Sequence, residues 1–236
     1  MKVEGCWANS LDDCHGKLSG EHVLSKSLLG EKIIVVEKEI SSGDESNFKS
    51  SAKKFKLKSL CEGHNNSLSK SDKEIQLFQR ALDEHIRPLN MPQPRLPIDG
   101  RQLEIWFAKT IVNYTAVAGI NININLKEIL PLLYYGKQFI KPYGLYVTTP
   151  EIKRKRDSDI SIMGWVENQE LIGGFFSLRH HKFIIALPNN TQALYEEKLS
   201  FLNTPEIKYW VGNPIVWHPK ELILMPQGNI IPINYL

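Results

Sequence analysis

Apolar residues recur with the period of an α-helix in three parts of the chain. The first stretch predicts a helix from about residue 65 to about residue 86, ended by Arg87-Pro88, because the residue before a proline disfavours helical geometry. The second predicts an amphipathic helix over 102–118, and the third a helix over 126–135 that stops at Gly136. The expected buried face of the first helix consists of Leu68, Ile75, Phe78 and Leu82.

Strand patterns dominate the second half of the chain. An early strand is expected at 33–36, where four β-branched residues follow one another. Residues 120–125 alternate isoleucine with asparagine, a pattern that suits either a strand or a loop. The remaining candidate strands are 143–148, 158–166, 171–178, 182–187, 215–218 and 222–225. Helices followed by many strands in one chain predict an α+β fold.

Turn-forming and proline-rich segments suggest how this fold is divided. Residues 1–20 are expected to form a loop with tight turns, and the Ser/Lys-rich residues 41–54 an insertion. Four prolines fall within 88–100, which makes this segment the best candidate for a linker. We therefore expect an N-terminal domain over 1–87, a linker over 88–100 and an α+β accessory domain over 101–236.

Composition limits the compartment and the class of partner. The net charge of +3 permits a polyanionic partner without requiring one. No apolar run approaches the roughly 18–20 residues that span a bilayer. The first residues contain no apolar core of a signal peptide, so a cytoplasmic location without a membrane partner is expected. Disulfides are rare in that compartment.

All three cysteines lie within the first 61 residues of the chain, in the region that also contains His15, His22 and His64. Cys61 and His64 are separated by two residues, the spacing at which two side chains can turn back onto one metal ion. Cys6 and Cys14 are separated by seven residues, so they share an ion only if the loop between them folds back. The four residues predict a closed, tetrahedral zinc site of structural type, with His15 as a rival ligand. Three ordinary buried thiols are the alternative.

Residues 6–82 resemble the HNH, or ββα-metal, endonucleases. The resemblance is carried by Glu21-His22-Val23, followed by Leu60-Cys61 and then His64-Asn65-Asn66 at the start of a helix. It implies a zinc-stapled ββα finger in which His22 is the general base. It also implies that a residue just after the last zinc ligand, Asn65 alone or together with Asn66, holds a catalytic Mg²⁺ or Mn²⁺ with Glu21.

The chain departs from the usual pattern of that family at three places. The zinc knuckle is the turn that carries two of the zinc ligands, here Cys61 and His64. In that family the second of these ligands is usually a cysteine, where this chain has His64. The residue after it is usually a cation-binding histidine, where this chain has Asn65. The central asparagine is replaced near Lys56, unless Asn47 takes its role.

The resemblance implies a metal-dependent endonuclease that hydrolyses phosphodiester bonds of DNA, with RNA as an alternative substrate. Such proteins occur in phage defence and in mobile elements. Two other functions stay open: a non-catalytic zinc finger that binds nucleic acid, and a protein-interaction module. The accessory domain could then serve a homodimer or a partner protein.

A basic stretch precedes the knuckle, and a second basic cluster lies at 153–156. The first is either a solvated strand edge or a rim that contacts phosphates. Its candidate nucleic-acid contacts are Lys53, Lys54, Lys56 and Lys58.

Overall fold

The fold is known from a computed structural model, in which α-helices pack against antiparallel sheets. The structure describes residues 2–22, 24, 33–38, 46–51, 56–85, 97–117, 122–140, 143–147, 160–178, 181–189, 216–217, 221–224 and 230–232. Within these residues, no helix is long and apolar enough to cross a membrane.

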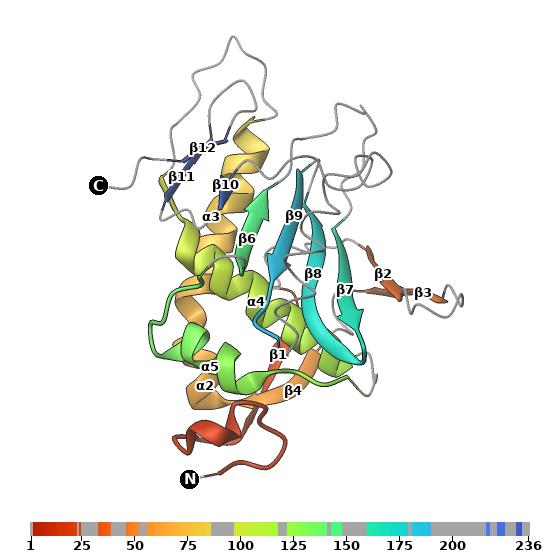
Figure 1. Cartoon of the computed structure of the whole chain (residues 1–236), viewed down its shortest axis with the longest axis vertical. Coiled ribbons are helices and arrows are strands. Elements are labelled where there is room, and N and C mark those ends of the chain that lie inside the picture. Colours follow the sequence, from red (N-terminus) through yellow and green to blue (C-terminus); the bar gives the residue numbers. More distant parts are fainter. Residues whose placement is uncertain are drawn as a thin grey trace.

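The largest sheet has seven strands in the order β10-β6-β9-β8-β7-β2-β3 (Figure 1). Adjacent strands of this sheet pair antiparallel, except that β2 and β7 pair parallel. The strands are β10 (Val216–Trp217), β6 (Gly144–Val147), β9 (His181–Ala186), β8 (Glu170–Leu178), β7 (Ser161–Glu167), β2 (Ile33–Lys38) and β3 (Ser46–Ser51). A three-stranded sheet contains β12 (Ile230–Pro232), β11 (Glu221–Leu224) and β5 (Pro97–Asp99).

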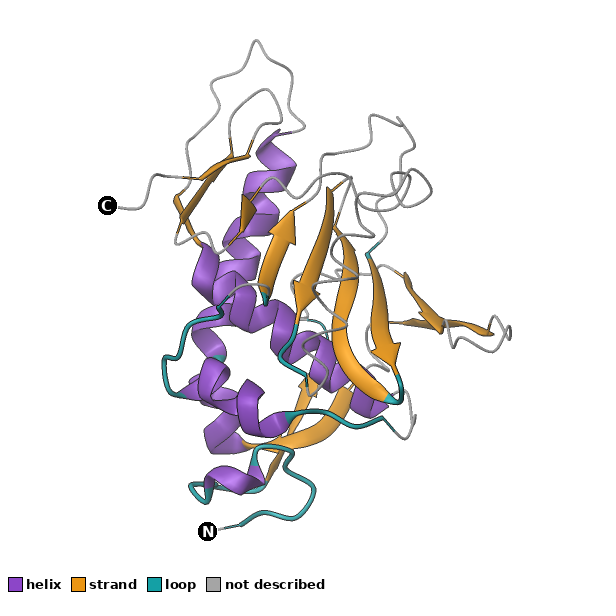
Figure 2. Cartoon of the chain, viewed as in Figure 1, coloured by secondary structure: helices purple, strands orange, loops and turns teal. Residues whose placement is uncertain are grey.

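Helix α4 (Gly100–Val117) runs across strands β6 to β9 (Figure 2). Its other side packs against α3 (Ser69–His85), so residues 103–115 are all buried. Phe107 meets Phe176 of β8 edge to face at 4.7 Å and Phe183 of β9 at 5.3 Å. A helix covered on two sides must also bury its polar positions, and Glu104 and Lys109 are 3% and 1% exposed.

The opposite face of the large sheet holds a second, smaller apolar cluster. Tyr146, Ile172, Ile184 and Ala186 form this cluster. Leu145, Phe183 and Ile185, which alternate with them along the same strands, belong to the main core instead. This alternation is the period of two expected of a strand.

A separate two-stranded sheet lies at the N-terminal end of the molecule. Strands β1 (Leu18–His22) and β4 (Lys56–Cys61) pair antiparallel, with Leu18 opposite Cys61 and His22 opposite Lys56. Helix α2 (Glu62–Ser67) begins directly after β4, and α5 (Leu126–Tyr134) lies close to it (Figure 1).

The helix and strand patterns predicted from residue 102 onward are confirmed. The predicted helices over 102–118 and 126–135 are α4 and α5, and the backbone at Gly136 has φ +74°, which favours glycine. All six strand candidates from residue 143 onward coincide with strands. The first five are β6 to β10, and 222–225 is β11. The helix expected over 65–86 is two helices, because the chain turns at Leu68 between α2 and α3.

Three predictions for loops were wrong in part. Residues 1–20 include the start of β1, and the expected insertion 41–54 contains β3, which pairs with β2 along six residues. The last residues of the expected linker 88–100 form β5 and the start of α4. Paired strands can form from polar sequences because the backbone, not the side-chain pattern, makes the ladder. The remaining residues of the segments 41–54 and 88–100 lie outside the described part of the chain.

One hydrophobic core contains residues from both sides of the predicted domain boundary. Phe78 of α3, for example, meets Phe183 of β9 edge to face at 5.5 Å. Leu60 of β4 and Ile111 of α4 belong to the same cluster. The division into domains over 1–87 and 101–236 stays a prediction.

Candidate metal centre

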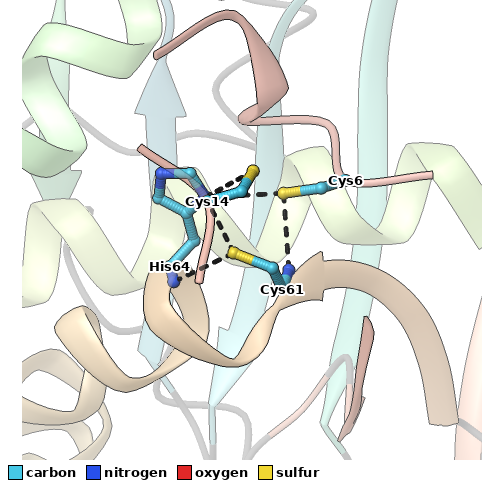
Figure 3. Close-up of side chains that lie close together, drawn as sticks. All are labelled: Cys6, Cys14, Cys61 and His64. Carbon is cyan, nitrogen blue, oxygen red and sulfur yellow. Dashed lines mark hydrogen bonds between the residues drawn. The ribbon is translucent and has the colours of Figure 1, made fainter. Parts of the chain in front are cut away.

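Four potential metal-binding atoms come together from three elements within the first 67 residues. Cys6 and Cys14 lie in the loop before β1, Cys61 ends β4, and His64 lies in the first turn of α2 (Figure 3). Their Sγ and ring nitrogen atoms all lie within 4.8 Å of one another, and all four residues are buried. This is the quartet that the spacing in the sequence predicted. This group of four described residues could hold a metal ion such as zinc.

The distances inside the quartet fit a tetrahedral ion. The Nδ1 atom of His64 lies 3.5 Å from Cys6 Sγ, 3.7 Å from Cys14 Sγ and 3.2 Å from Cys61 Sγ. Zinc bonds of about 2.3 Å to sulfur and 2.0–2.1 Å to nitrogen, at tetrahedral angles, require about 3.5 Å between nitrogen and sulfur. The donor set and the distances from Nδ1 to the three sulfur atoms therefore fit a Cys3His site.

The start of α2 explains why the short Cys-x2-His segment aims both side chains the same way. Cys61 is the N-cap of α2, with extended backbone (ψ 162°), and its Sγ accepts a hydrogen bond from the N–H of His64 at 3.4 Å. The N–H of Cys61 donates to Cys6 Sγ at 3.4 Å. These N–H groups favour thiolate over thiol, because each donates to the charged form.

The loop before β1 is held by backbone contacts to the knuckle. Gly63 donates its N–H to the carbonyl oxygen of His15 at 3.0 Å, and Glu62 donates to that of Lys17 at 2.9 Å. A side chain at position 63 would meet Cβ of His15 at 3.0 Å, so glycine permits this close approach. Asn9 Oδ1 accepts from the Val3 N–H at 2.8 Å and from Cys14 Sγ at 3.4 Å.

The thiols differ in their acidity. Burial raises the pKa of the Cys6 thiol to about 12, against weaker opposing hydrogen bonds from the backbone. Burial also raises the pKa of Cys61, but hydrogen bonds from the backbone N–H groups of His64 and His15 outweigh it, so its pKa is below the usual value. A bound divalent metal would ionise the thiols that coordinate it.

The ring of His64 has neighbours on its outer side as well. Its Nε2 atom lies 2.8 Å from Asp13 Oδ1. The ring of Tyr134, from α5, meets it edge-on with centroids 5.0 Å apart. Trp7 lies beside Tyr134 and donates its indole N–H to Asn113 Oδ1 of α4 at 2.8 Å. The metal centre is thus joined to α4 and α5, the two helices that follow residue 100.

The remaining predicted site residues lie along β1 and α2. Asn65 donates its Nδ2 to Ser19 Oγ of β1 at 3.0 Å. Glu21 and His22 are the last two residues of β1, paired with Leu57 and Lys56, but their side chains lie outside the described part. His15, the rival zinc ligand, is exposed and does not belong to the quartet.

The basic residues are only partly described. Lys58 is exposed on β4, and Lys56 pairs through its backbone with β1. Lys53, Lys54 and the cluster 153–156 lie outside the described residues.

No family model, curated protein or solved structure matches this chain. Its function must therefore be argued from its own residues. The sequence reasoning missed Asp13 and Tyr134, which surround the imidazole. The position of Asp13 next to Cys14 was a usable signal, because metal-binding histidines commonly donate their second N–H to a carboxylate. No local signal pointed to Tyr134.

Proposed function

We propose that this chain is a zinc-stapled endonuclease of the HNH type, which hydrolyses phosphodiester bonds of nucleic acid, with DNA as the expected substrate. The observation that supports it most is the order of parts around the metal centre. A strand ending in Glu21-His22 pairs with a strand ending in Cys61, and a helix carrying His64 and Asn65 follows at once. This order of two strands and a helix supports the proposal of a ββα unit, with Cys61 and His64 at its turn and Cys6 and Cys14 supplied by the loop before β1.

In this proposal zinc is structural, because four protein ligands close its coordination sphere. Cys6, Cys14, Cys61 and His64 would hold it. A divalent cation of the Mg²⁺ or Mn²⁺ class would neutralise charge on the phosphate. Asn65 and Glu21 would hold that cation, since amide and carboxylate oxygens are the ligands such ions prefer.

The amide of Asn65 supports this assignment. Its nitrogen donates to Ser19 Oγ of β1 at 3.0 Å. Ser19 precedes His22 by three residues on the same strand, so the hydrogen bond places α2 beside the strand that carries the proposed base. His22 would take a proton from the attacking water, a role for which an imidazole is suited near neutral pH.

A second candidate function has an observation of its own. The contacts from His64 to Tyr134, and from Trp7 to Asn113, connect the metal centre to helices α5 and α4. A protein that uses zinc only to stabilise a binding or interaction module would have the same contacts. Such a module would bind nucleic acid or a partner protein and would not need His22.

Nicking of a supercoiled plasmid with Mg²⁺, Mn²⁺ or Ni²⁺ separates the two candidates. We expect cleavage by the natural chain and a loss of about 10²- to 10⁴-fold in rate for His22→Ala, because that is the usual contribution of a general base. His15→Ala is the matched control, an exposed histidine of the same region outside the quartet. No cleavage with any cation would leave the binding module as the better account. Full activity of His22→Ala at equal zinc content would overturn the role of His22 as general base, and with it the HNH mechanism proposed here.

A further inference from the structure

The two nitrogens of the His64 ring face different surroundings. Nδ1 points toward the three sulfur atoms, at 3.2–3.7 Å. Nε2 points the other way, to Asp13 Oδ1 at 2.8 Å. The imidazole is 5% exposed, whereas the Asp13 side chain is 52% exposed. The carboxylate therefore meets water on one side and the buried ring on the other.

A histidine that binds a cation through Nδ1 must be neutral and must carry its remaining proton on Nε2. A carboxylate 2.8 Å from Nε2 accepts a strong, charge-assisted hydrogen bond from that N–H group. The alternative tautomer, with its proton on Nδ1, would turn a lone pair toward the negative carboxylate and an N–H toward the metal position. The hydrogen bond also increases the electron density that Nδ1 can donate.

The backbone fixes the position of this carboxylate. Asp13 directly precedes the ligand Cys14, so one short segment supplies a thiolate and the group that orients the histidine. Asp12 next to it has the left-handed conformation (φ 58°), and its N–H donates to the carbonyl oxygen of Asn9 at 3.2 Å. On the far side, the knuckle is joined to this segment through the bond from Gly63 to His15.

We propose that Asp13 is a positioning residue of the metal centre. It fixes the tautomer and the ring orientation of His64, so that the Nδ1 lone pair faces the ion, and it strengthens binding of a borderline-soft divalent cation such as zinc. This inference rests on the proposed function only in so far as both require zinc in the quartet.

The test is the zinc affinity of the purified full chain, measured by competition with a chromophoric chelator. Loss of such an outer hydrogen bond typically costs 10- to 100-fold in metal affinity, and we expect a loss in this range for Asp13→Ala. Asp13→Asn should lose less, because its amide oxygen can still accept from Nε2.

Asp12→Asn is the matched control. It removes the same charge one residue away, at a side chain that is 68% exposed and pairs with Lys2 at 3.5 Å. Asparagine also accepts the left-handed backbone at this position. The affinity of this variant should equal that of the natural chain.

A second measurement detects the hydrogen bond itself. In the zinc-loaded natural chain, NMR of labelled histidine should find a proton on Nε2 of His64 that is shifted downfield and exchanges slowly with water. Asp13→Ala should lose the shift and the protection while the rest of its spectrum stays folded. This spectrum of the natural chain decides the matter even if Asp13→Ala does not fold.

The outcomes separate the two proposals. If the natural chain binds zinc but Asp13→Ala binds it as tightly as Asp12→Asn, Asp13 has no positioning role and the zinc site stands. The same conclusion holds if the natural chain binds zinc while its Nε2 proton is absent or exchanges freely. If the natural chain binds no zinc, both proposals are overturned.

Discussion

Glu104 gives the sharpest link between this fold and a measurable pH dependence. Its carboxyl group is 3% exposed between α4 and the large sheet, and it accepts a hydrogen bond from the Leu145 N–H at 3.1 Å. Burial raises its pKa from 4.5 to about 8, against smaller opposing effects of this hydrogen bond and of the Arg101 charge. Burial and the nearby Glu104 charge raise the pKa of Tyr146 to about 12.

The sign of the effect follows from proton linkage. The folded chain holds the Glu104 proton more tightly than the unfolded chain, so its contribution to stability is complete below pH 4.5 and is lost as the pH rises toward 8. Each pH unit in that window costs about 1.4 kcal/mol, to an upper limit of about 5 kcal/mol above pH 8. Glu104→Gln cannot ionise and keeps an oxygen that can accept from Leu145.

The free energy of unfolding should be measured by urea denaturation of zinc-saturated protein at pH 5.5 and 7.5. The stability of Glu104→Gln relative to the natural chain should rise by about 3 kcal/mol between these two values. Glu128→Gln, at a side chain that is 47% exposed, is the control and should show no such rise. A difference between Glu104→Gln and the natural chain that stays constant with pH would refute the reasoning.

Two further predictions concern charges on other elements. The carboxylate of Asp72 lies 2.8 Å from the ammonium of Lys109, whose side chain is 1% exposed. Asp72→Ala leaves this buried charge unpaired and should lower the free energy of unfolding by about 3–5 kcal/mol. The double variant that also carries Lys109→Met should recover much of this loss. A loss below about 1 kcal/mol in denaturation of Asp72→Ala would show that the buried charge is otherwise compensated. If the strand β4 contacts phosphates, replacing Lys56 and Lys58 by alanine should flatten the slope of log affinity for DNA against log salt by roughly 1 to 2. Lys73→Ala, on the exposed side of α3, should leave that slope unchanged, and an equal slope for all variants would assign β4 to a solvated surface.

The sequence predicted those parts of the fold whose signals are local. Helices α4 and α5 and the strands from β6 to β9 have the periods of their own elements, so their existence follows from short windows of residues. The metal quartet was predictable for the same reason, since Cys61 and His64 are close in sequence. Cys6 and Cys14 then followed as the other cysteines of the chain.

The parts that the sequence did not predict depend on contacts between distant residues. The polar strand β3 is defined by its pairing with β2, and the parallel pairing of β2 with β7 joins segments more than 120 residues apart. The contact of Tyr134 with His64 likewise exists only once α5 packs beside α2. The burial of Glu104 and Lys109 could not be foreseen, because an amphipathic pattern predicts one buried face and α4 is buried on two.

The most direct test of the account is the metal content of the purified chain. Native mass spectrometry or elemental analysis should find one zinc per natural chain. Cys61→Ala should lose the zinc and, because binding to such a site contributes directly to folding, should no longer have a folded N-terminal third. A natural chain that is fully folded without zinc, and a Cys61→Ala variant with the same melting temperature, would contradict the metal centre and every proposal that rests on it.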